Sequence, residues 1–401
     1  MKPTFYRKVL KNGMTIVFEK RDLPVVNVAF AVRNGGVNEA GFEKGISHFI
    51  EHMLYKGTPT RNAKQIAEEI ERKGGVLNGF TSETVTAYWC KMPSKHVNVA
   101  LNVLSDIVKN PKFDEKELEK ERKVIFEEMK MYKDDPKRYV LDEIQSYLYG
   151  EPLGLNLIGT EKTMGSISRD KMIKKFEEVY QPNNIILCVV GDTNFDKIVD
   201  FAEKNFNNKK GKVSEFKINL KNKTKIEFRT GIDQANLIFA YHVPVSRDKK
   251  NYAAQVLSCL MAEGMSSRLF SEIREKRNLA YAVKGYSDIN SLYAYNAIYV
   301  GTTKSAVEEV KKIILQEFGK IKEDLNEKEL EQVKDQLIGN YQISMEDSQR
   351  QMVGLLLSEI DGDAKEFYEY EKNIQKVQLS DVKKIAEKVK NAYSFFALVP
   401  K

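Results

Sequence analysis

The feature that most constrains the fold of this 401-residue chain is an internal repeat. The segment 114–120, Asp-Glu-Lys-Glu-Leu-Glu-Lys, returns at 326–332 as Asn-Glu-Lys-Glu-Leu-Glu-Gln, close to half the chain length further on. An apolar segment of helical period precedes each copy, at 97–108 and at 307–318. Helices rich in Lys and Glu can mimic a repeat, but the matching order of the elements predicts a duplicated domain.

The hydrophobic pattern in each half predicts an α+β fold. Runs with apolar residues at every second position, such as 25–33, predict strands, and they alternate with segments of helical period. The polar stretch 207–212 has no periodicity and marks a boundary between the halves. We therefore expect two homologous domains joined by a linker, with bounds 1–210, 211–222 (the linker) and 223–401.

A pair of histidines in the first half predicts a metal site. His48, Glu51 and His52 fall in one turn of a predicted helix, in a chain that contains four histidines. Residues four apart lie on the same face of a helix, so the two imidazoles can bind one metal ion. Glu51 lies on the same side and can act on a water bound to that metal. This order of residues is known from zinc peptidases, although short motifs also arise by chance.

A catalytic zinc ion usually has three protein ligands, so a third ligand is needed. The predicted helix 114–133 offers Glu121 and Glu128, which both border its apolar stripe. One of these carboxylates could bind the metal while the other supports a ligand. A helix this rich in Glu and Lys is also typical of a solvated surface, so the residues alone leave the third ligand open.

Four stretches of the first half form a recognisable set: 45–58 around the histidine pair, 78–84, 121–136 and 180–184. They resemble the pitrilysin and insulin-degrading family of zinc peptidases, in particular its half-length branch, which includes the mitochondrial processing peptidases. The resemblance implies that Glu128 is the third ligand, because it follows the second histidine at the family's spacing. It also implies a supporting role for Glu121 and leaves Glu127 as the nearest competitor of Glu128.

The second half keeps the expected architecture without the metal-binding residues. Glu128 corresponds to Asn340 in the repeat, and the region around residue 260 contains no histidine. The segment 264–281 resembles a second block of the family, in which an arginine and a tyrosine reach the substrate at the zinc. The resemblance assigns these roles to Arg274 and Tyr281, since a guanidinium and a phenol suit a peptide carbonyl and its oxyanion. The alternative is an exposed arginine and a half-buried core tyrosine.

The resemblance further implies that each domain is a mainly antiparallel sheet packed against helices on one side. Asn78, Gly79, Phe80 and Thr81 would form an edge strand, which in the family pairs with the substrate backbone. Main-chain pairing of this kind gives affinity with little demand on the substrate sequence. The alternative is a turn into an ordinary core strand, which Gly75 and Gly79 also permit.

Composition excludes several other classes of protein. The three cysteines are scattered, which argues against a disulfide framework and for a reducing compartment. No apolar run is long enough to span a bilayer, and the chain starts without a signal or transit pattern, so we expect a cytoplasmic protein without membrane contact. The net charge of +7 is modest and not concentrated in one stretch, so no nucleic-acid partner is expected.

These observations together predict a zinc-dependent endopeptidase that hydrolyses unstructured peptides. One zinc ion per chain would be held by His48, His52 and Glu128, and Glu51 would act as general base. Because the chain carries both family blocks, the resemblance implies a homodimer whose sites receive Arg274 and Tyr281 from the other subunit. The alternatives are a non-catalytic assembly subunit of the same fold and a metal-dependent hydrolase of small molecules.

Overall fold

The computed structural model describes residues 4–401, which form two compact units. The first unit comprises the chain up to Met129 together with Leu157–Lys217 and Ser344–Phe367. The second unit comprises Lys130–Asn156, Ile218–Ile343 and Tyr368–Lys401. Each unit is built on one sheet with helices, so the expected α+β fold is confirmed.

The sheet of the first unit has six strands and is mainly antiparallel. Its only parallel neighbours among the described residues are β2 and β6. Strand β4 stands at one end of the sheet, as expected for an edge strand, and pairs with β5 alone. The order of strands is β1 (Thr4–Val9), β2 (Thr15–Lys20), β6 (Ile185–Gly191), β3 (Val25–Val32), β5 (Thr86–Pro93) and β4 (Val76–Thr81).

The core of the first unit lies between one face of this sheet and a layer of helices. Every second residue of β3, from Val26 to Val32, points into this core, which is the alternation that the sequence predicted. Amphipathic helices supply the opposite side of the core. These are α1 (Ile46–Leu54), α2 (Ala63–Glu71), α3 (Val97–Lys109), α4 (Glu115–Asp134), α6 (Glu161–Ser166), α7 (Arg169–Val179) and α8 (Phe195–Asn205).

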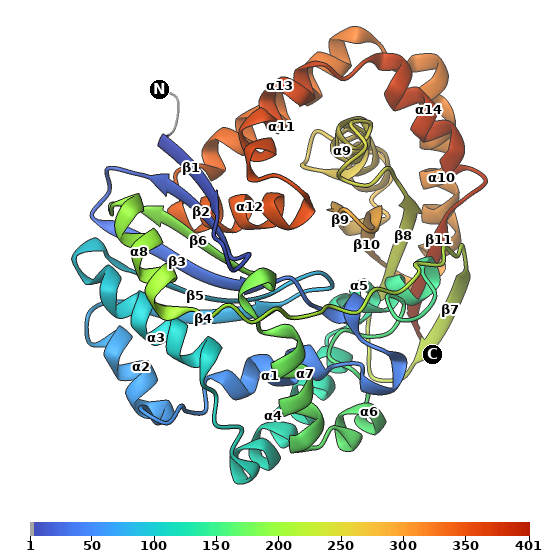
Figure 1. Cartoon of the computed structure of the whole chain (residues 1–401). Coiled ribbons are helices and arrows are strands. Elements are labelled where there is room, and N and C mark those ends of the chain that lie inside the picture. The colour runs from blue at the N-terminus through green and yellow to red at the C-terminus, as the bar shows by residue number, and fades with distance from the viewer. Residues whose placement is uncertain (1–3) are drawn as a thin grey trace. The chain divides into compact units, whose positions relative to one another are not determined.

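The other face of the same sheet is covered as well, by helix α12 (Ser348–Asp361) from the second half of the sequence. Figure 1 shows α12 and α3 on opposite sides of the strands. Several contacts of α12 are polar: Asn27 Nδ2 donates to Ser348 Oγ at 2.8 Å, and the Glu359 carboxylate accepts from Arg7 and Arg33 at 2.8–2.9 Å. The expectation of helices on one side of the sheet was therefore wrong for this unit, because alternate strand residues on the second face are also buried and need a cover.

The second unit repeats this arrangement with five strands. Neighbours β7 and β11 are parallel and the other pairs antiparallel, just as β2 and β6 are the parallel pair of the first sheet. The order matches that of the first sheet without its outermost strand β1. It is β7 (Thr224–Arg229), β11 (Ser394–Pro400), β8 (Ala235–His242), β10 (Ala294–Thr302) and β9 (Ala280–Ile289).

Helices also cover both faces of the second sheet. Helix α5 (Pro136–Leu148), which comes from the first half of the sequence, packs against β8 and β11. Aromatic rings make this contact, since Tyr147 stacks on Phe396 with ring centres 5.2 Å apart. The core on the opposite face is closed by α9 (Asn251–Ala262), α10 (Val307–Asp324), α11 (Glu327–Ser344), α13 (Tyr370–Gln375) and α14 (Leu379–Val389).

The compact units therefore do not follow the sequence as two contiguous segments. The expected bounds 1–210, 211–222 and 223–401 separate β1–β6 from β7–β11, whereas α5 and α12 each belong to the unit built on the other half's sheet. The two helices occupy equivalent places in the repeat, because each follows the helix that carries the repeated segment. Both also begin at an aspartate cap, Asp135 and Asp347, whose side chains accept from backbone N–H groups of the first turn.

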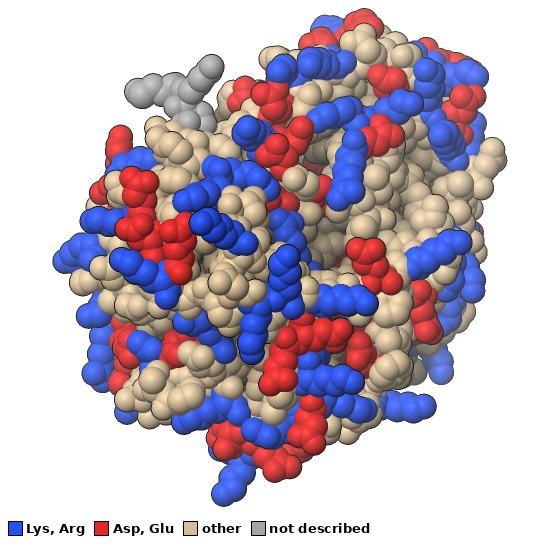
Figure 2. Space-filling model, in the orientation of Figure 1, with Lys and Arg blue, Asp and Glu red and all other residues tan. Residues whose placement is uncertain are grey.

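The surface is highly charged and mixed in sign. Figure 2 shows Lys and Arg side chains interspersed with Asp and Glu over most of the face in view. Within residues 4–401, no helix combines the length and the apolar character that a bilayer span requires.

Candidate metal centre

Helix α1 carries the histidine pair, and its start is fixed by two unusual residues. Gly45 has φ +97°, and a side chain there would lie 2.7 Å from Ile158 O, so only glycine fits. The buried carboxylate of Glu39 accepts hydrogen bonds from Gly45 N at 2.9 Å and Ser47 N at 2.7 Å. It thus satisfies amide groups that the first turn of a helix leaves without partners. This anchoring fixes the position from which His48 and His52 project.

The two histidines meet Glu128 of helix α4. The distance from His48 Nε2 to Glu128 Oε2 is 3.7 Å, and the distance from His52 Nε2 to the same oxygen is 3.6 Å. Leu118 and Ile125 bury one stripe of α4 in the core, which turns Glu128 toward α1. The structure therefore brings together the three residues expected as ligands, whereas Glu127 is exposed and lies outside the group.

The geometry of this group fits a metal ion. Its three candidate ligand atoms lie within 4.8 Å of one another, and no second group of three such residues exists among residues 4–401. Two imidazoles and one carboxylate form a donor set typical of catalytic zinc, with the fourth position left for water or substrate. Burial, with the nearby His52 as a smaller cause, lowers the pKa of His48 to about 3. His48 is therefore held as neutral imidazole, which is the form that binds metals.

A chain of hydrogen bonds supports the Nδ1 side of the His52 ring, opposite to the nitrogen that faces Glu128. Its Nδ1 lies 3.1 Å from Glu121 Oε2, and the other oxygen of Glu121 pairs with Lys56 Nζ at 2.6 Å. Burial alone would raise the pKa of Glu121, but the hydrogen bonds to His52 and Lys56 outweigh it and lower that pKa. An ionised carboxylate at this place fixes the ring of His52 with Nε2 directed toward Glu128. Glu121 thus lies beside a candidate ligand, as the sequence predicted for a supporting residue. The pairing of Lys56 with Glu121 was not predicted.

Glu51, the expected general base, lies on α1 between the two histidines and is held from the sheet. Thr81 Oγ1 of strand β4 donates a hydrogen bond of 2.7 Å to Glu51 Oε2. Burial raises the pKa of Glu51, and the bond from Thr81 and the proximity of His52 oppose this change. A carboxylate with a raised pKa beside a metal site is suited to accept and return a proton near neutral pH.

The segment 78–81 is the end of edge strand β4, and it passes directly over this site. A side chain at Gly79 would collide with the Tyr55 hydroxyl and lie 3.2 Å from Glu51 Oε1. Glycine thus permits the close approach of strand and helix. Thr81 was expected to bind substrate, and its bond to Glu51 is a role that sequence reasoning missed.

Arg274 and Tyr281 both belong to the second unit. Arg274 lies on a π-helical turn, Phe270–Glu275, with its guanidinium 4.9 Å from the centre of the Phe270 ring. Single π-helical turns are frequent at functional sites. Tyr281 is 52 % exposed on edge strand β9, so it is not the half-buried core tyrosine of the alternative reading.

Three further residues support the site, and for two of them the sequence carries no local signal of that role. Glu39 caps α1 from a preceding loop, and Tyr55 places a buried hydroxyl beside Gly79 and Glu51. Lys56 follows His52 at helical spacing, which could have indicated a shared face. These residues act through contacts that only the fold creates.

Two histidines and a glutamate converge beside the half-buried Glu51 on one of two homologous α+β units, an arrangement typical of metallohydrolases of duplicated architecture. Comparison with known families agrees. The family model described as insulinase (peptidase family M16) matches residues 15–161, and the model described as peptidase M16 inactive domain matches residues 166–337.

Curated relatives cover most of the chain. An uncharacterized zinc protease of Rickettsia felis is 35% identical over 350 residues, which is 86% of this chain and 85% of the relative. The uncharacterized zinc protease YmxG of Bacillus subtilis is 33% identical over 351 residues, 86% of each. The chain therefore belongs to the M16 (insulinase) family of peptidases.

Solved structures share the fold over the whole length. A protease from Helicobacter pylori superposes with a TM-score of 0.91 at 23% identity, covering 99% of this chain and 100% of that one. A peptidase M16 inactive domain from Pseudomonas fluorescens gives 0.89 at 19% identity, with 99% and 98% covered. At these identities the likeness establishes the fold alone.

Proposed function

We propose that this protein is a zinc-dependent endopeptidase that hydrolyses unstructured peptides. The observation that carries the proposal is the convergence of His48, His52 and Glu128 within 4.8 Å, with Glu51 beside them. A zinc ion held by these three residues would act as a Lewis acid and lower the pKa of a coordinated water to about 7.

The chain's own residues supply the proton transfers. Glu51 accepts the proton of the attacking water and returns it to the leaving amine, as a general base that becomes a general acid. Thr81 holds one oxygen of Glu51 and leaves the other available. Glu121 keeps His52 oriented, so that its Nε2 faces the same point as that of His48.

Peptide substrates would bind as an added strand on the free edge of β4. Asn78, Gly79, Phe80 and Thr81 lie on this edge, and their spacing from Glu51 brings an added backbone to the general base. Strand addition requires an extended peptide, so folded proteins would be poor substrates. Arg274 and Tyr281 would bind the carbonyl and its oxyanion from the second subunit of a homodimer. Their exposure and the presence of both family blocks in one chain support this arrangement.

We propose a reducing compartment on the basis of the three cysteine thiols. Cys90, Cys188 and Cys259 are all free and buried, and burial raises the pKa of each. Cysteines that form no disulfide favour a reducing compartment such as the cytoplasm.

Metal dependence tests the proposal. We expect one zinc ion per chain by elemental analysis, and we expect a chelator to remove both the metal and the hydrolysis of a quenched-fluorescent peptide. His48→Ala and His52→Ala should lose the metal, whereas Glu121→Ala should weaken it by about 10- to 100-fold. A fully active preparation without metal would contradict the proposal. Hydrolysis of small esters or amides without any hydrolysis of peptides would favour a small-molecule hydrolase instead.

A further inference from the structure

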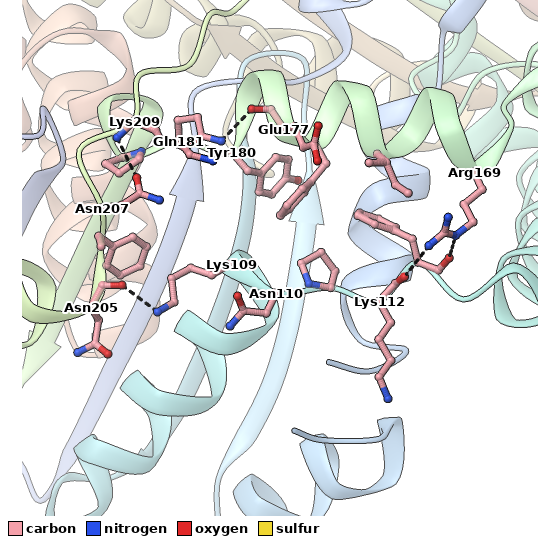
Figure 3. Close-up of a pocket in the computed structure, with 16 residues that line it drawn as sticks. Lys109, Asn110, Lys112, Arg169, Glu177, Tyr180, Gln181, Asn205, Asn207 and Lys209 are labelled. Atoms are coloured by element: carbon pink, nitrogen blue, oxygen red, sulfur yellow. Dashed lines mark hydrogen bonds between the residues drawn. The ribbon is translucent and has the colours of Figure 1, made fainter. Parts of the chain in front are cut away.

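The outer edge of strand β7, in the second unit, has hydrogen-bonding groups that no strand within residues 4–401 uses (Figure 1). The cations in the pocket beside the ends of α3, α7 and α8 differ in this respect, because carbonyls of the chain already bind them (Figure 3). Lys109 Nζ donates to Asn205 O at 2.8 Å, and Arg169 Nε donates to Phe113 O at 2.6 Å. The edge of β7 is therefore the place where the fold leaves room for a partner.

The pairing of β7 with β11 shows which of its backbone groups face outward. The carbonyls of Lys223 and Arg229 both accept from N–H groups of β11 and the residue that follows it, each at 3.0 Å. Backbone groups of successive strand residues point to opposite edges, so those of Thr224, Ile226 and Phe228 point away from β11. Each of these three residues offers one N–H and one C=O group to a further strand.

Two apolar side chains are exposed at the same edge. Ile226 and Phe228 lie on the core side of the sheet, beside Ala397 and Val399 of β11. They are nevertheless 38 % and 55 % exposed, since no helix covers the sheet this far out. Lys304 Nζ lies 5.8 Å from the centre of the Phe228 ring and leaves this much of the side chain uncovered.

The first sheet shows what completes such an edge. Its strand β2 is the counterpart of β7, because each is the parallel neighbour of the last strand of its sheet. There β1 pairs antiparallel with the outer edge of β2, and the rings of Tyr6 and Phe18 lie 6.2 Å apart between centres. Phe18 is 1 % exposed. An antiparallel strand added to β7 would cover Ile226 and Phe228 in the same way.

The charges on the other face of β7 indicate which strand fits. When two copies of β7 pair antiparallel with Ile226 opposite Ile226, Lys225 of each strand lies opposite Glu227 of the other. A shift by two residues would bring Lys225 opposite Lys225 or Glu227 opposite Glu227, which is unfavourable. A shift by one residue would place charged side chains on the apolar face. Arg229 is directed elsewhere, with its guanidinium 4.1 Å from the centre of the Tyr139 ring.

We propose that β7 pairs with β7 of a second copy of this chain, antiparallel and centred on Ile226. All the outward backbone groups then find partners, because Thr224 and Phe228 form the two hydrogen-bonded pairs on either side. Charged residues on an edge strand usually prevent pairing, but here their order favours a copy of the same strand. The contact is separate from the proposed peptidase function, since Tyr281 lies on β9, the opposite edge of this sheet.

Cysteine cross-linking of the full-length protein tests the register. Ile226→Cys places a thiol opposite its own copy, where the Cα atoms of the pair are about 5.5 Å apart and within disulfide range. We expect mild oxidation to give a covalent dimer on a non-reducing gel. The three native cysteines are buried, so they should add little background.

Thr224→Cys is the matched control, because it is exposed on the same edge but lies opposite Phe228 of the other copy. Its own copy would be about 13 Å away along the strand, so this variant alone should give at least about fivefold less dimer. A mixture of Thr224→Cys and Phe228→Cys should cross-link again, as the register requires.

Charge reversal tests the choice of partner. In the Ile226→Cys background, Lys225→Glu creates two pairs of like charges and should lower the cross-linked fraction at least about fivefold, normalised to the labelling rate of the free thiol. The double variant Lys225→Glu/Glu227→Lys restores opposite charges and should restore cross-linking. Lys388→Glu, at an exposed position of α14, should change nothing. The proposal is overturned if Ile226→Cys cross-links no more than Thr224→Cys, if Lys225→Glu has no effect, or if the double variant does not recover.

Discussion

At the scale of single residues, the hydrogen bond between Thr81 and Glu51 joins two parts of the proposed mechanism. Thr81 lies on the strand that would pair with the substrate, and Glu51 would transfer the proton. A substrate that pairs with β4 would therefore contact the same strand whose Thr81 orients Glu51. In the proposed mechanism, strand binding and proton transfer would share this one contact.

Glu51→Gln should leave the metal bound and remove most of the activity. Glutamine has nearly the same shape and can still accept from Thr81, but it cannot take up a proton. We expect kcat to fall about 10²- to 10⁴-fold, the usual contribution of a general base. Metal content by elemental analysis and peptide hydrolysis should be measured on the same sample. Loss of the metal together with the activity would mean that Glu51 is structural.

Thr81→Val should change the pH profile more than the affinity for substrate. The bond from Thr81 favours the ionised form of Glu51, so its removal should raise the pKa of Glu51 further. Because the base must be ionised, the acid limb of kcat/KM should move to higher pH, and activity should be lost earlier as the pH falls. A suitable control is Thr224→Val, which alters an exposed threonine of β7 in the second unit. An unshifted limb in Thr81→Val would argue against this coupling.

At the scale of elements, helix α12 is attached to the first sheet through buried polar groups as well as through apolar side chains such as Met352 and Leu355. Glu359 is 1 % exposed and accepts from both Arg7 and Arg33, while Gln351 bonds Arg21 and Glu19. A buried carboxylate is stable only while such partners remain. The helix thus covers the sheet through a specific pattern of buried hydrogen bonds and ion pairs in addition to its apolar side chains.

Glu359→Ala should destabilise the first unit. Breaking a buried ion pair typically costs about 3–5 kcal/mol, and we expect about 2 kcal/mol here because both arginines keep partial access to water. Urea unfolding followed by the fluorescence of Trp89, the single tryptophan, reports on this unit because Trp89 lies on β5. Glu203→Gln removes the exposed pair with Lys8 and should change the unfolding free energy by less than about 1 kcal/mol. Equal effects of the two variants would contradict the importance of Glu359.

The sequence predicted where helices and strands lie along the chain much better than it predicted which elements pack against each other. Alternation located β3 and β4, and helical spacing located His48 and His52 on α1, whereas the family resemblance singled out Glu128 on α4. Which sheet α12 covers could not be read from its residues, since an amphipathic helix with Met352, Leu355 and Glu359 on one face could pack against either sheet. The hydrogen bond from Thr81 to Glu51 could not be predicted either. It joins distant parts of the chain and depends on the close approach of β4 to α1 that Gly79 permits.

At the scale of the whole molecule, the proposed homodimer makes a prediction about mixed subunits. Glu51→Gln and the double variant Arg274→Ala/Tyr281→Phe should each be inactive alone. If Arg274 and Tyr281 act on the partner's metal centre, a mixed dimer contains one site with all wild-type groups, so mixing should restore activity. Mixed dimers can be verified with two different affinity tags. Mixed dimers that form but stay inactive would contradict completion of the site by the partner.

The exchange of α5 and α12 also sets the order in which this chain can become complete on the ribosome. Strands β1–β6 are all made before residue 217, yet the cover of their second face is not made until α12 has emerged. At ordinary rates of synthesis the delay is on the order of ten seconds. During that time Asn27, Arg33 and Glu19 face water or a chaperone in place of their final partners. This face also carries Val17, Ala29 and Ala31, which are fully buried in the finished protein, so the sheet exposes apolar surface to other nascent chains until α12 covers it.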